Sequence, residues 1–324
     1  MNQGSFADTG FVKKPKLTRR RRFLNEMELV VPWAMLIQRI APHYPVAGSG
    51  RRPIVLETML RIHFMQQWFG YSDPAMEEAL HDVPCLRQFA KLDAGCDAMP
   101  DESTILKFRH LLEAHQLASA LFNDISAMLA ERGLILRQGT VVDATLIAAA
   151  PSTKNRDRKR DPQMTHSKKG NQYHFGMKAH IGVDVDSGLV HTLQITTAKV
   201  ADCVMRDSLT HGDENIVLGD RGYTDNDHNL SATRDDCDPV WGMPFKRPPN
   251  GVLTQEQTLL NRMLASMRAI VEHPFRVLKC QFGYTKVRYR GLYKNGQQLY
   301  LLFALSNLFR ARKAIIPVQH NYVY

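Results

Sequence analysis

The spacing of apolar residues changes near residue 135 and divides the chain into two parts. Before it, the segments IVLETMLRIHFMQQWF, PDESTILKFRHLLEAHQ and LASALFNDISAMLAERG repeat apolar positions every three or four residues, which predicts amphipathic helices. SDPAMEEALHD offers Asp73 as a helix N-cap, with Pro74 at the first helical position. We therefore expect residues 1–135 to be helical.

From residue 139 the pattern is typical of strands. GTVVDATLIAA is rich in β-branched residues, and YHFGMKAHIGVDVDSGLVHTLQITTA predicts a hairpin that turns at residues 186–188. A short helix around DCVMRDSLT, a strand NIVLG, a helix near DNDHNLSATRD, a strand in PVWGMPFK and a long helix from about Thr254 follow. This order is that of a ribonuclease-H-like α/β fold, in which helices flank a mixed sheet.

The pattern predicts two domains and a tail. Residues 1–135 are expected to form an all-helical domain and residues 136–315 the ribonuclease-H-like domain, with a tail at 316–324. Within the second domain, residues 151–172 are polar, basic and without periodicity. This composition indicates an inserted flexible loop that could close on DNA.

Positive charge is concentrated in three segments of a chain whose net charge is +10. Residues 13–22 contain seven Lys or Arg and no acid, residues 151–170 seven against two acids, and residues 262–313 eleven against one. Focused positive charge favours a polyanionic partner, because each neutralised phosphate releases counterions. Short helices behind a basic arm then indicate a helix-turn-helix-like DNA-binding domain, with solvated surface charges or a purely structural helical bundle as alternatives. The cations expected to contact DNA are Lys13, Lys14, Lys16, Arg19, Arg20, Arg21, Arg22, Arg51, Arg52, Lys168, Lys169, Lys178, Lys286 and Arg288.

Other classes of protein are disfavoured by cysteine usage and hydropathy. The five cysteines are scattered and form no CxxC pair, which argues against a disulfide framework and a zinc site. His174, His180 and His191 alternate on the hairpin strands and are expected to be packed or solvated rather than metal ligands. No apolar run approaches the roughly 18 residues of a membrane helix, and the N-terminus lacks a secretory pattern. We expect a cytoplasmic, nucleoid-associated protein with no membrane partner.

Two acidic residues lie in or just after predicted strands. Asp143 is within GTVVDATLIAA, and Asp220 follows the apolar run in ENIVLGDRGY. The two strands are neighbours in the expected topology, so both carboxylates can converge, and a converging pair of acids needs a cation. Oxygen ligands favour Mg²⁺ or Mn²⁺, and two such ions can catalyse phosphoryl transfer. Asp184, Asp186 and Asp202 compete as the second ligand, and Asp143 alone could be a strand-end acid that a backbone donor satisfies.

A third acid, Glu272, lies in SMRAIVEHPFRVLK on the predicted long helix. The helical period places Arg268, Glu272 and Lys279 near one another beside an apolar stripe, where the cations could hold DNA phosphates. Pro274 is expected to kink the helix after residue 273. Alternatively, Glu272 only forms an i,i+4 ion pair with Arg268. The expected apolar stripe consists of Leu260, Leu264, Met267 and Val271.

Three motifs in the second part of the chain carry a family resemblance. TVVDATLI, GDRGY and RAIVEHPFRVLK supply Asp, Asp-x-Gly-Tyr and Arg-x₃-Glu-x₆-Lys in this order. Together they resemble the DDE transposases of bacterial insertion sequences, specifically the insertion sequence five family. The front segment GSGRRPIVLETMLRIHFMQQW is similar to the same family, so that the resemblance covers nearly the whole chain. One departure is Ala265, where the family often has a tyrosine three positions before the arginine.

The resemblance implies a catalytic triad of Asp143, Asp220 and Glu272 that holds two Mg²⁺ or Mn²⁺ ions. Arg268 and Lys279 would neutralise phosphate. We expect a transposase that binds the terminal inverted repeats of its element, cleaves DNA and transfers strands, and acts as a homodimer on DNA. A repressor that has lost catalysis and a nuclease that only hydrolyses DNA are the competing functions.

Overall fold

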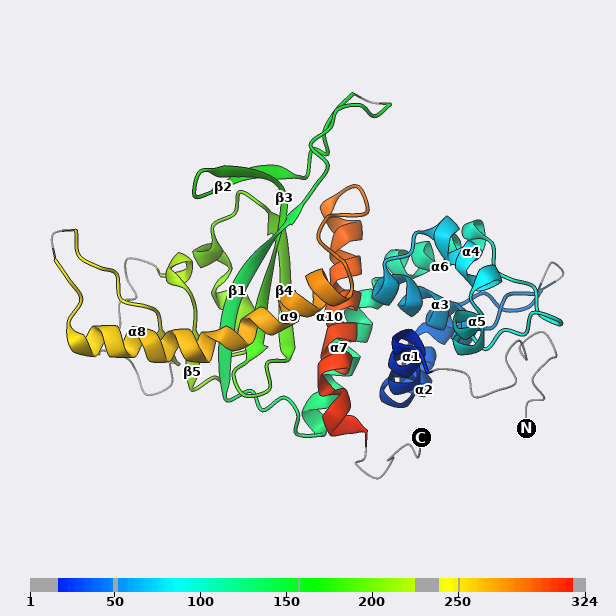
Figure 1. Ribbon diagram of the computed structural model, residues 1–324, viewed down its shortest axis with the longest axis horizontal. Helices are drawn as coiled ribbons and strands as arrows, with labels where there is room; N and C mark the ends of the chain where they lie inside the picture. Colours follow the sequence, from blue (N-terminus) through cyan, green and yellow to red (C-terminus); the bar gives the residue numbers. More distant parts are fainter. Residues whose placement is uncertain (1–16, 49–51, 157, 225–238, 250, 317–324) are drawn as a thin grey trace. The chain divides into compact units, whose positions relative to one another are not determined.

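The computed structural model contains two compact units, which are described separately (Figure 1). One contains the residues up to Ile125 together with those from Leu308, and the other is Ser126–Asn307. No helix in the described ranges combines the length and hydrophobicity that a membrane span requires. The described residues are 17–48, 52–156, 158–224, 239–249 and 251–316.

The second unit is built on a six-stranded mixed sheet (Figure 1). β1, β2 and β4 all pair antiparallel with the long β3, while β5 runs parallel to β1 and β6 parallel to β5. The expected adjacency of the first strand and the strand before Asp220 is therefore confirmed. The mixed sheet with its helices is the predicted ribonuclease-H-like α/β arrangement. The strands are β1 (Gly139–Ala148), β2 (Thr165–Lys169), β3 (Gln172–Asp184), β4 (Val190–Thr197), β5 (Ile216–Leu218) and β6 (Val240–Gly242).

Two details of this unit differ from the sequence prediction. The loop expected over residues 151–172 contains β2, which pairs with the start of β3 across a turn at Gly170, whose φ is +61°. Backbone hydrogen bonds to β3 order this polar segment. The spacing of apolar residues cannot predict such pairing. The helix expected around DCVMRDSLT is two short 3₁₀ segments, η3 (Asp202–Met205) and η4 (Asp207–Leu209). The helix expected near DNDHNLSATRD lies outside the described residues.

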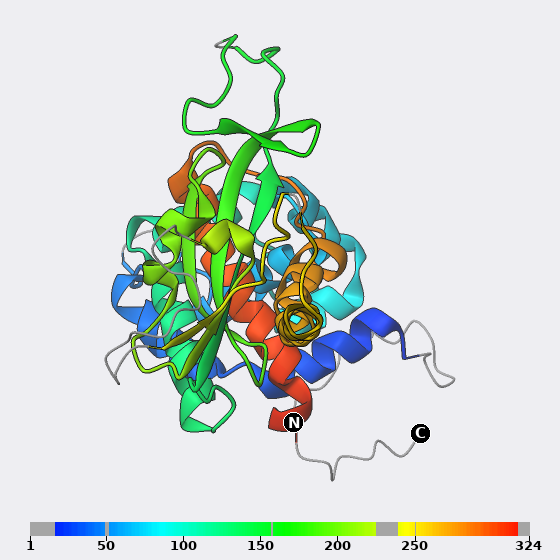
Figure 2. The same cartoon turned by 90° about the vertical axis from the view of Figure 1, so that its left-hand side faces the viewer.

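One long helix, α10 (Leu292–Ile315), packs its first part on the sheet (Figure 2). The Asn307 side-chain amide accepts from the Val190 N–H at 2.9 Å and donates to the Val190 carbonyl at 2.7 Å. Tyr300 donates its hydroxyl to the Leu193 carbonyl at 3.1 Å. These side chains satisfy backbone groups of β4 that have no strand beside them, which anchors the helix to the sheet.

The chain around Glu272 forms an almost continuous helical path. It consists of α8 (Gln255–Arg268), a 3₁₀ turn η6 (Ala269–Val271), α9 (Glu272–Arg276) and a π turn η7 (Val277–Gln281). Pro274, which was expected to kink the helix, lies in the first turn of α9, where its missing N–H is not needed. The helix changes from 3₁₀ to α geometry before Pro274 and from α to π geometry after it. Figure 2 shows α8 almost end-on, beside the sheet.

The expected apolar stripe of this helix is only partly buried. Val271 is buried, and Leu264 packs on the backbone of Gly242. Leu260 and Met267 are 45% and 41% exposed, so the expectation of one continuous packed stripe is wrong for them. α8 contacts the sheet unit mainly through the Leu264 and Asn261 side, where Asn261 bonds to the backbone of Phe245.

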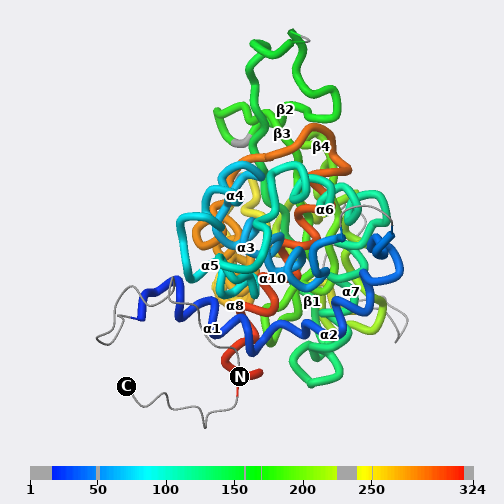
Figure 3. Tube along the Cα trace, turned by 90° about the vertical axis from the view of Figure 1, so that its right-hand side faces the viewer, coloured from blue at the N-terminus to red at the C-terminus, as the bar shows by residue number. Residues whose placement is uncertain are grey.

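The first unit is helical, as the sequence predicts (Figures 1 and 3). Its central helix α3 is buried on all sides from Thr58 to Trp68, which is why its sequence is apolar beyond one face. The N-cap of α4 is Ser72 rather than the expected Asp73, since the Ser72 hydroxyl accepts from the Ala75 N–H. The helices are α1 (Arg19–Val30), α2 (Trp33–Ile40), α3 (Leu56–Phe69), α4 (Asp73–Asp82), α5 (Pro84–Phe89), α6 (Glu102–Ala114) and α7 (Leu117–Glu131), whose last residues belong to the second unit.

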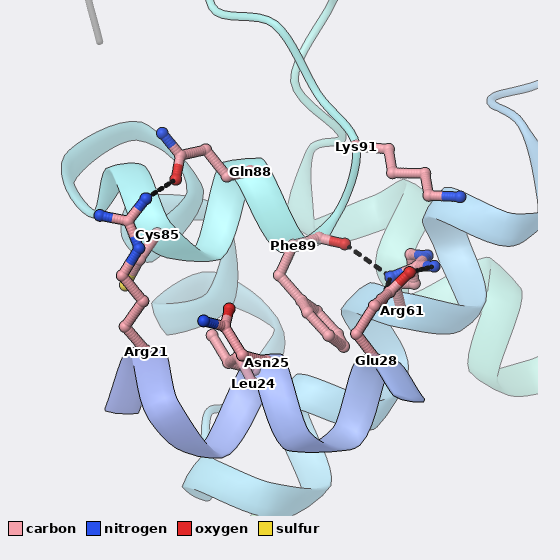
Figure 4. Close-up of a pocket in the computed structure, with 9 residues that line it drawn as sticks. All are labelled: Arg21, Leu24, Asn25, Glu28, Arg61, Cys85, Gln88, Phe89 and Lys91. Atoms are coloured by element: carbon pink, nitrogen blue, oxygen red, sulfur yellow. Dashed lines mark hydrogen bonds and ion pairs between the residues drawn. The ribbon is translucent and has the colours of Figure 1, made fainter. Parts of the chain in front are cut away.

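A buried arginine joins four helices of this unit, α1, α2, α3 and α5. The Arg61 side chain on α3 is 1% exposed and forms ion pairs with Glu57 on the same helix and Glu28 on α1. It also donates to the Phe89 carbonyl at 3.1 Å and lies over the Trp33 ring, 4.1 Å from the ring centroid. Figure 4 shows Arg61 facing Glu28 and the Phe89 carbonyl. At this point the helices are therefore held together by a paired charge and not by apolar side chains alone.

Candidate active site

Two strands place Asp143 and Asp220 at the same level of the sheet. In the parallel β1–β5 pair, Val141 lies opposite Leu218. Asp143 follows Val141 by two residues, and Asp220 follows Leu218 by two residues. Because parallel strands advance equally along the chain, the continued register brings the two carboxylates to the same edge.

Asp220 ends its strand in a tight, well-anchored turn. It is the N-cap of the 3₁₀ turn η5 (Arg221–Tyr223), and its Oδ1 accepts from the Gly222 N–H at 2.7 Å. A side chain at Gly222 would place its Cβ 2.9 Å from that oxygen and would therefore displace the Asp220 carboxylate from this position. Tyr223 is fully buried in a core with Val142 and neighbouring residues. The GDRGY motif thus fixes the acid through a hydrogen bond on one side and core packing on the other.

The helical path from α8 to η7 brings Arg268, Glu272 and Lys279 to the same place. All three line a cleft of about 910 Å³ together with Asp143 and Asp220. Lys279 donates its ammonium to the Thr145 hydroxyl on β1 at 2.5 Å. Arg268 and Glu272 form no ion pair with one another in the described part of the chain, which disfavours the i,i+4 alternative.

The acids of the cleft act on one another electrostatically. Burial raises the pKa of Asp143 to about 6, and the charges of Asp220 and Glu272 contribute to this rise. The Ala144 N–H, which donates to Asp143 Oδ1 at 2.8 Å, and the Arg268 guanidinium lower the same pKa. Burial is thus the main cause of the rise, and a cation bound between these carboxylates would relieve the part that comes from their mutual repulsion.

The protonation of Asp143 predicts how metal-free protein responds to pH. The folded-state pKa of Asp143 lies above its ordinary value of 3.8, so Asp143 contributes stability that is lost as pH rises through about 6. Asp143→Asn removes this loss. We expect the variant to exceed the parent protein by about 1–2 kcal/mol in free energy of unfolding at neutral pH, but not at about pH 4. Urea unfolding in EDTA at both pH values measures this difference, and two parallel pH curves would contradict it.

The carboxylates of the cleft suit a divalent cation that a phosphate of the substrate would also coordinate. Among the described residues, no three His, Cys, Asp or Glu side chains are close enough to enclose a metal ion. Mg²⁺, however, is usually bound by one or two carboxylates with water and substrate phosphates rather than by a closed cage. Carboxylate oxygens converging on an open cleft, one of them with a raised pKa, suit this kind of site.

The other acids considered for the second ligand position lie in different environments. Asp184 is fully buried, and its carboxylate accepts from the N–H groups of Leu136, Arg137 and Ser187, which makes it structural. Asp186 is exposed next to the β3–β4 turn. Asp202, in contrast, lines the cleft.

The cations predicted to bind DNA are distributed over both units. Lys168 and Lys178 line the cleft, while Lys286 and Arg288 are exposed in the second unit. The first unit carries exposed Arg19, Arg20, Arg22 and Arg52, and Arg21, which donates to Gln88 at 3.1 Å (Figure 4). Lys13, Lys14, Lys16, Arg51 and the side chain of Lys169 lie outside the described residues.

Several residues of the cleft were not singled out from the sequence. Thr145 holds Lys279, and Ser167 of β2 lines the cleft with Phe275. His174, which was expected to be packed or solvated, lies in the same lining. The alternation along β1 could have identified Thr145, since it shares a face with Asp143. Ser167 reaches the cleft because it lies on β2, and this strand was not predicted because its segment is polar.

Comparison with known families agrees with this site. A family model described as "Transposase DDE domain" matches residues 135–308, and a second, described as "Transposase domain (DUF772)", matches residues 12–111. No solved structure matches the chain. Transposase domains imply DNA as partner, and DDE domains normally use divalent metal ions. Because the first match covers more than half of the sequence and includes Asp143, Asp220 and Glu272, the chain belongs to the transposase DDE domain family.

Proposed function

We propose that this protein is the transposase of an insertion sequence of the insertion sequence five family. It binds the terminal inverted repeats of the element, cleaves DNA at the element end and joins the end to target DNA. The observation that carries this proposal is the convergence of Asp143, Asp220 and Glu272, from three distant segments, on one cleft with Arg268 and Lys279.

The three carboxylates would hold two Mg²⁺ or Mn²⁺ ions. Bound there, the ions supply activation of the attacking oxygen and stabilisation of the departing one. Asp220 is held rigidly by its turn, and Asp143 by β1, so both oxygens are positioned before substrate arrives. Arg268 and Lys279 neutralise the phosphate that reacts.

The reaction consists of two phosphoryl transfers at one centre. Water first attacks the phosphodiester at the element end, the P–O3′ bond breaks, and a 3′-hydroxyl is released. That hydroxyl then loses its proton and attacks a phosphodiester of target DNA, so one bond forms as another breaks. No covalent bond to the protein is needed. Because two ends are joined together, the protein acts as a homodimer on DNA.

DNA recognition is assigned to the helical part of the chain. Residues 1–135, with their basic arm, form a helix-turn-helix-like domain that reads the repeat, and residues 136–315 form the catalytic domain, with the tail at 316–324. Arginines on α1 contact phosphates, which set the register of binding, while a few base contacts set its sequence. The basic segment 151–172, of which β2 is a part, contacts DNA near the cleft.

Strand transfer by the purified protein tests this function. The assay uses a labelled element end taken from DNA that flanks the gene, a plasmid target, and parallel reactions in Mg²⁺ and EDTA. Metal-dependent cutting and joining supports the proposal. Binding without cutting or joining would indicate a repressor, and cutting without joining would indicate a nuclease.

The arginines of α1 predict how DNA binding depends on salt. Replacement of Arg19, Arg20 and Arg22 by Gln should lower affinity at low salt and reduce the slope of log K against log salt by about 0.9 for each lost phosphate contact. All three side chains are exposed, and of the contacts that they make in the described structure only that of Arg20 with the Phe69 ring would be lost, so stability should fall by no more than about 0.5–1 kcal/mol. Fluorescence anisotropy at several salt concentrations gives the slope. An unchanged slope would remove α1 from the DNA-binding surface.

A further inference from the structure

A fourth carboxylate, Asp202, lines the cleft beside the proposed triad. Its Oδ1 accepts from the Lys178 ammonium at 2.9 Å, and the same ammonium donates to the Val200 carbonyl at 2.7 Å. Lys178 also lines the cleft, and its side chain is only 13% exposed. The lysine is therefore held by two acceptors instead of extending freely into solvent.

A buried histidine stands behind Asp202. His180 is fully buried, and its Nε2 lies 2.8 Å from the Thr196 hydroxyl oxygen. That hydroxyl also lies 3.2 Å from the Thr197 carbonyl oxygen, so its one proton has two acceptors, of which His180 Nε2 is the nearer. Burial lowers the pKa of His180 to about 4, and the ring is neutral at physiological pH.

The other nitrogen of the ring faces Asp202. His180 Nδ1 has no hydrogen-bond partner in the described part of the chain and lies 3.7 Å from Asp202 Oδ1. The carboxylate attracts a proton on Nδ1, and the Thr196 hydroxyl then donates to Nε2. The Lys178 ammonium and the His180 ring therefore both present positive hydrogens towards Asp202 Oδ1, which holds this carboxylate in place.

The register of the sheet relates this group to the proposed triad. Lys178 lies opposite Leu146 on β1, whereas Lys279 contacts the adjacent Thr145. Successive residues of a strand point to opposite faces, so the two lysines approach the strand that carries Asp143 from its two sides. The other Asp202 oxygen lies against Gly222, in the turn that holds Asp220.

We propose that Asp202, backed by His180, is a positioning residue that fixes the Lys178 ammonium in the cleft, where Lys178 binds a phosphate of the reacting DNA strand. The ligand class is a phosphodiester, and the inference rests on the proposed function. Without Asp202, Lys178 keeps its charge but is no longer held in a fixed position. The cleavage rate should then fall more than the affinity for DNA, because most of that affinity comes from the other cations.

Single-turnover cleavage at saturating DNA tests the proposal. Asp202→Asn should lower the cleavage rate by about 10- to 100-fold, with the DNA dissociation constant changed less than about twofold. Lys178→Met should lower the rate to a similar extent, and the double variant should be no slower than Lys178→Met, since both act through one ammonium. Asp207→Asn, which removes an exposed carboxylate from the next 3₁₀ segment, is the matched control and should cleave normally. A normal rate for Asp202→Asn, or multiplied effects in the double variant, would overturn the proposal.

A second measurement does not require catalysis. Acetylation of Lys178, followed by mass spectrometry, should be slow in the parent protein, slower still with element-end DNA, and faster in folded Asp202→Asn, with little protection by DNA. Equal Lys178 reactivity with and without DNA in the parent protein would overturn the proposal even if Asp202→Asn fails to fold. If the parent protein neither cuts nor joins DNA, the proposed function fails. The labelling still shows whether Lys178 contacts DNA and whether Asp202 holds it.

Discussion

Glu272→Gln is expected to abolish metal-dependent cleavage and strand transfer, with a loss of at least about 1,000-fold. The side chain is exposed at the cleft and is the acid that the helical path contributes. Its amide replacement keeps the shape but removes the charge that would hold a cation. Folding should be unaffected, because Glu272 has no partner whose loss could destabilise the described structure. Affinity for element-end DNA should also remain, since it depends on cations elsewhere.

The experiment compares Glu272→Gln and Asp220→Asn with a matched control in the same assay. Glu256→Gln makes the identical chemical change in the first turn of α8, away from the cleft, and should retain full activity. DNA binding is measured in parallel by anisotropy. Persistent Mg²⁺-dependent cutting by Asp220→Asn would transfer the role of second ligand to Asp202, since Asp184 is committed to backbone hydrogen bonds.

Arg61→Ala is expected to lower the free energy of unfolding by about 3–5 kcal/mol. The substitution leaves Glu28 and Glu57 without their buried cation and removes the contacts with Trp33 and the Phe89 carbonyl. Glu57 keeps its ion pair with Lys91, so the cost comes from Glu28, from the Phe89 carbonyl that loses its donor and from the space that the buried side chain filled. DNA binding by the helical unit should fall with its folded fraction.

Urea unfolding followed by circular dichroism measures this effect. Arg39→Ala is the control, because Arg39 also forms a bidentate pair, with Asp124, but its side chain is 50% exposed. That surface pair should contribute only about 0–1 kcal/mol. Equal losses for the two variants would show that burial does not govern the strength of these pairs.

Local patterns predicted the elements that depend on neighbouring residues. The 3.6-residue period identified α3, α6 and α7, whereas α1, α2 and α5 were not singled out. Gly133 follows α7 with φ of +68°, as expected of a helix C-terminus. The hairpin turn was also correct, with Gly188 at φ +68°. β2 was missed because a strand of polar residues is specified by its partner, and the packing of Leu260 and Met267 was misjudged because periodicity cannot tell which face finds a neighbour.

The sequence by itself determined the composition of the candidate site: Asp143 on a strand, Asp220 after another, and Glu272 between two cations on a helix. It could do so because motif spacing reflects local geometry. Only the tertiary structure decided which acids meet. It committed Asp184 to backbone hydrogen bonds and brought Asp202 to the cleft on a 3₁₀ segment. The Lys178, Asp202 and His180 group also emerged only from the folded chain, because hydrogen bonds between segments have no period that a sequence can display.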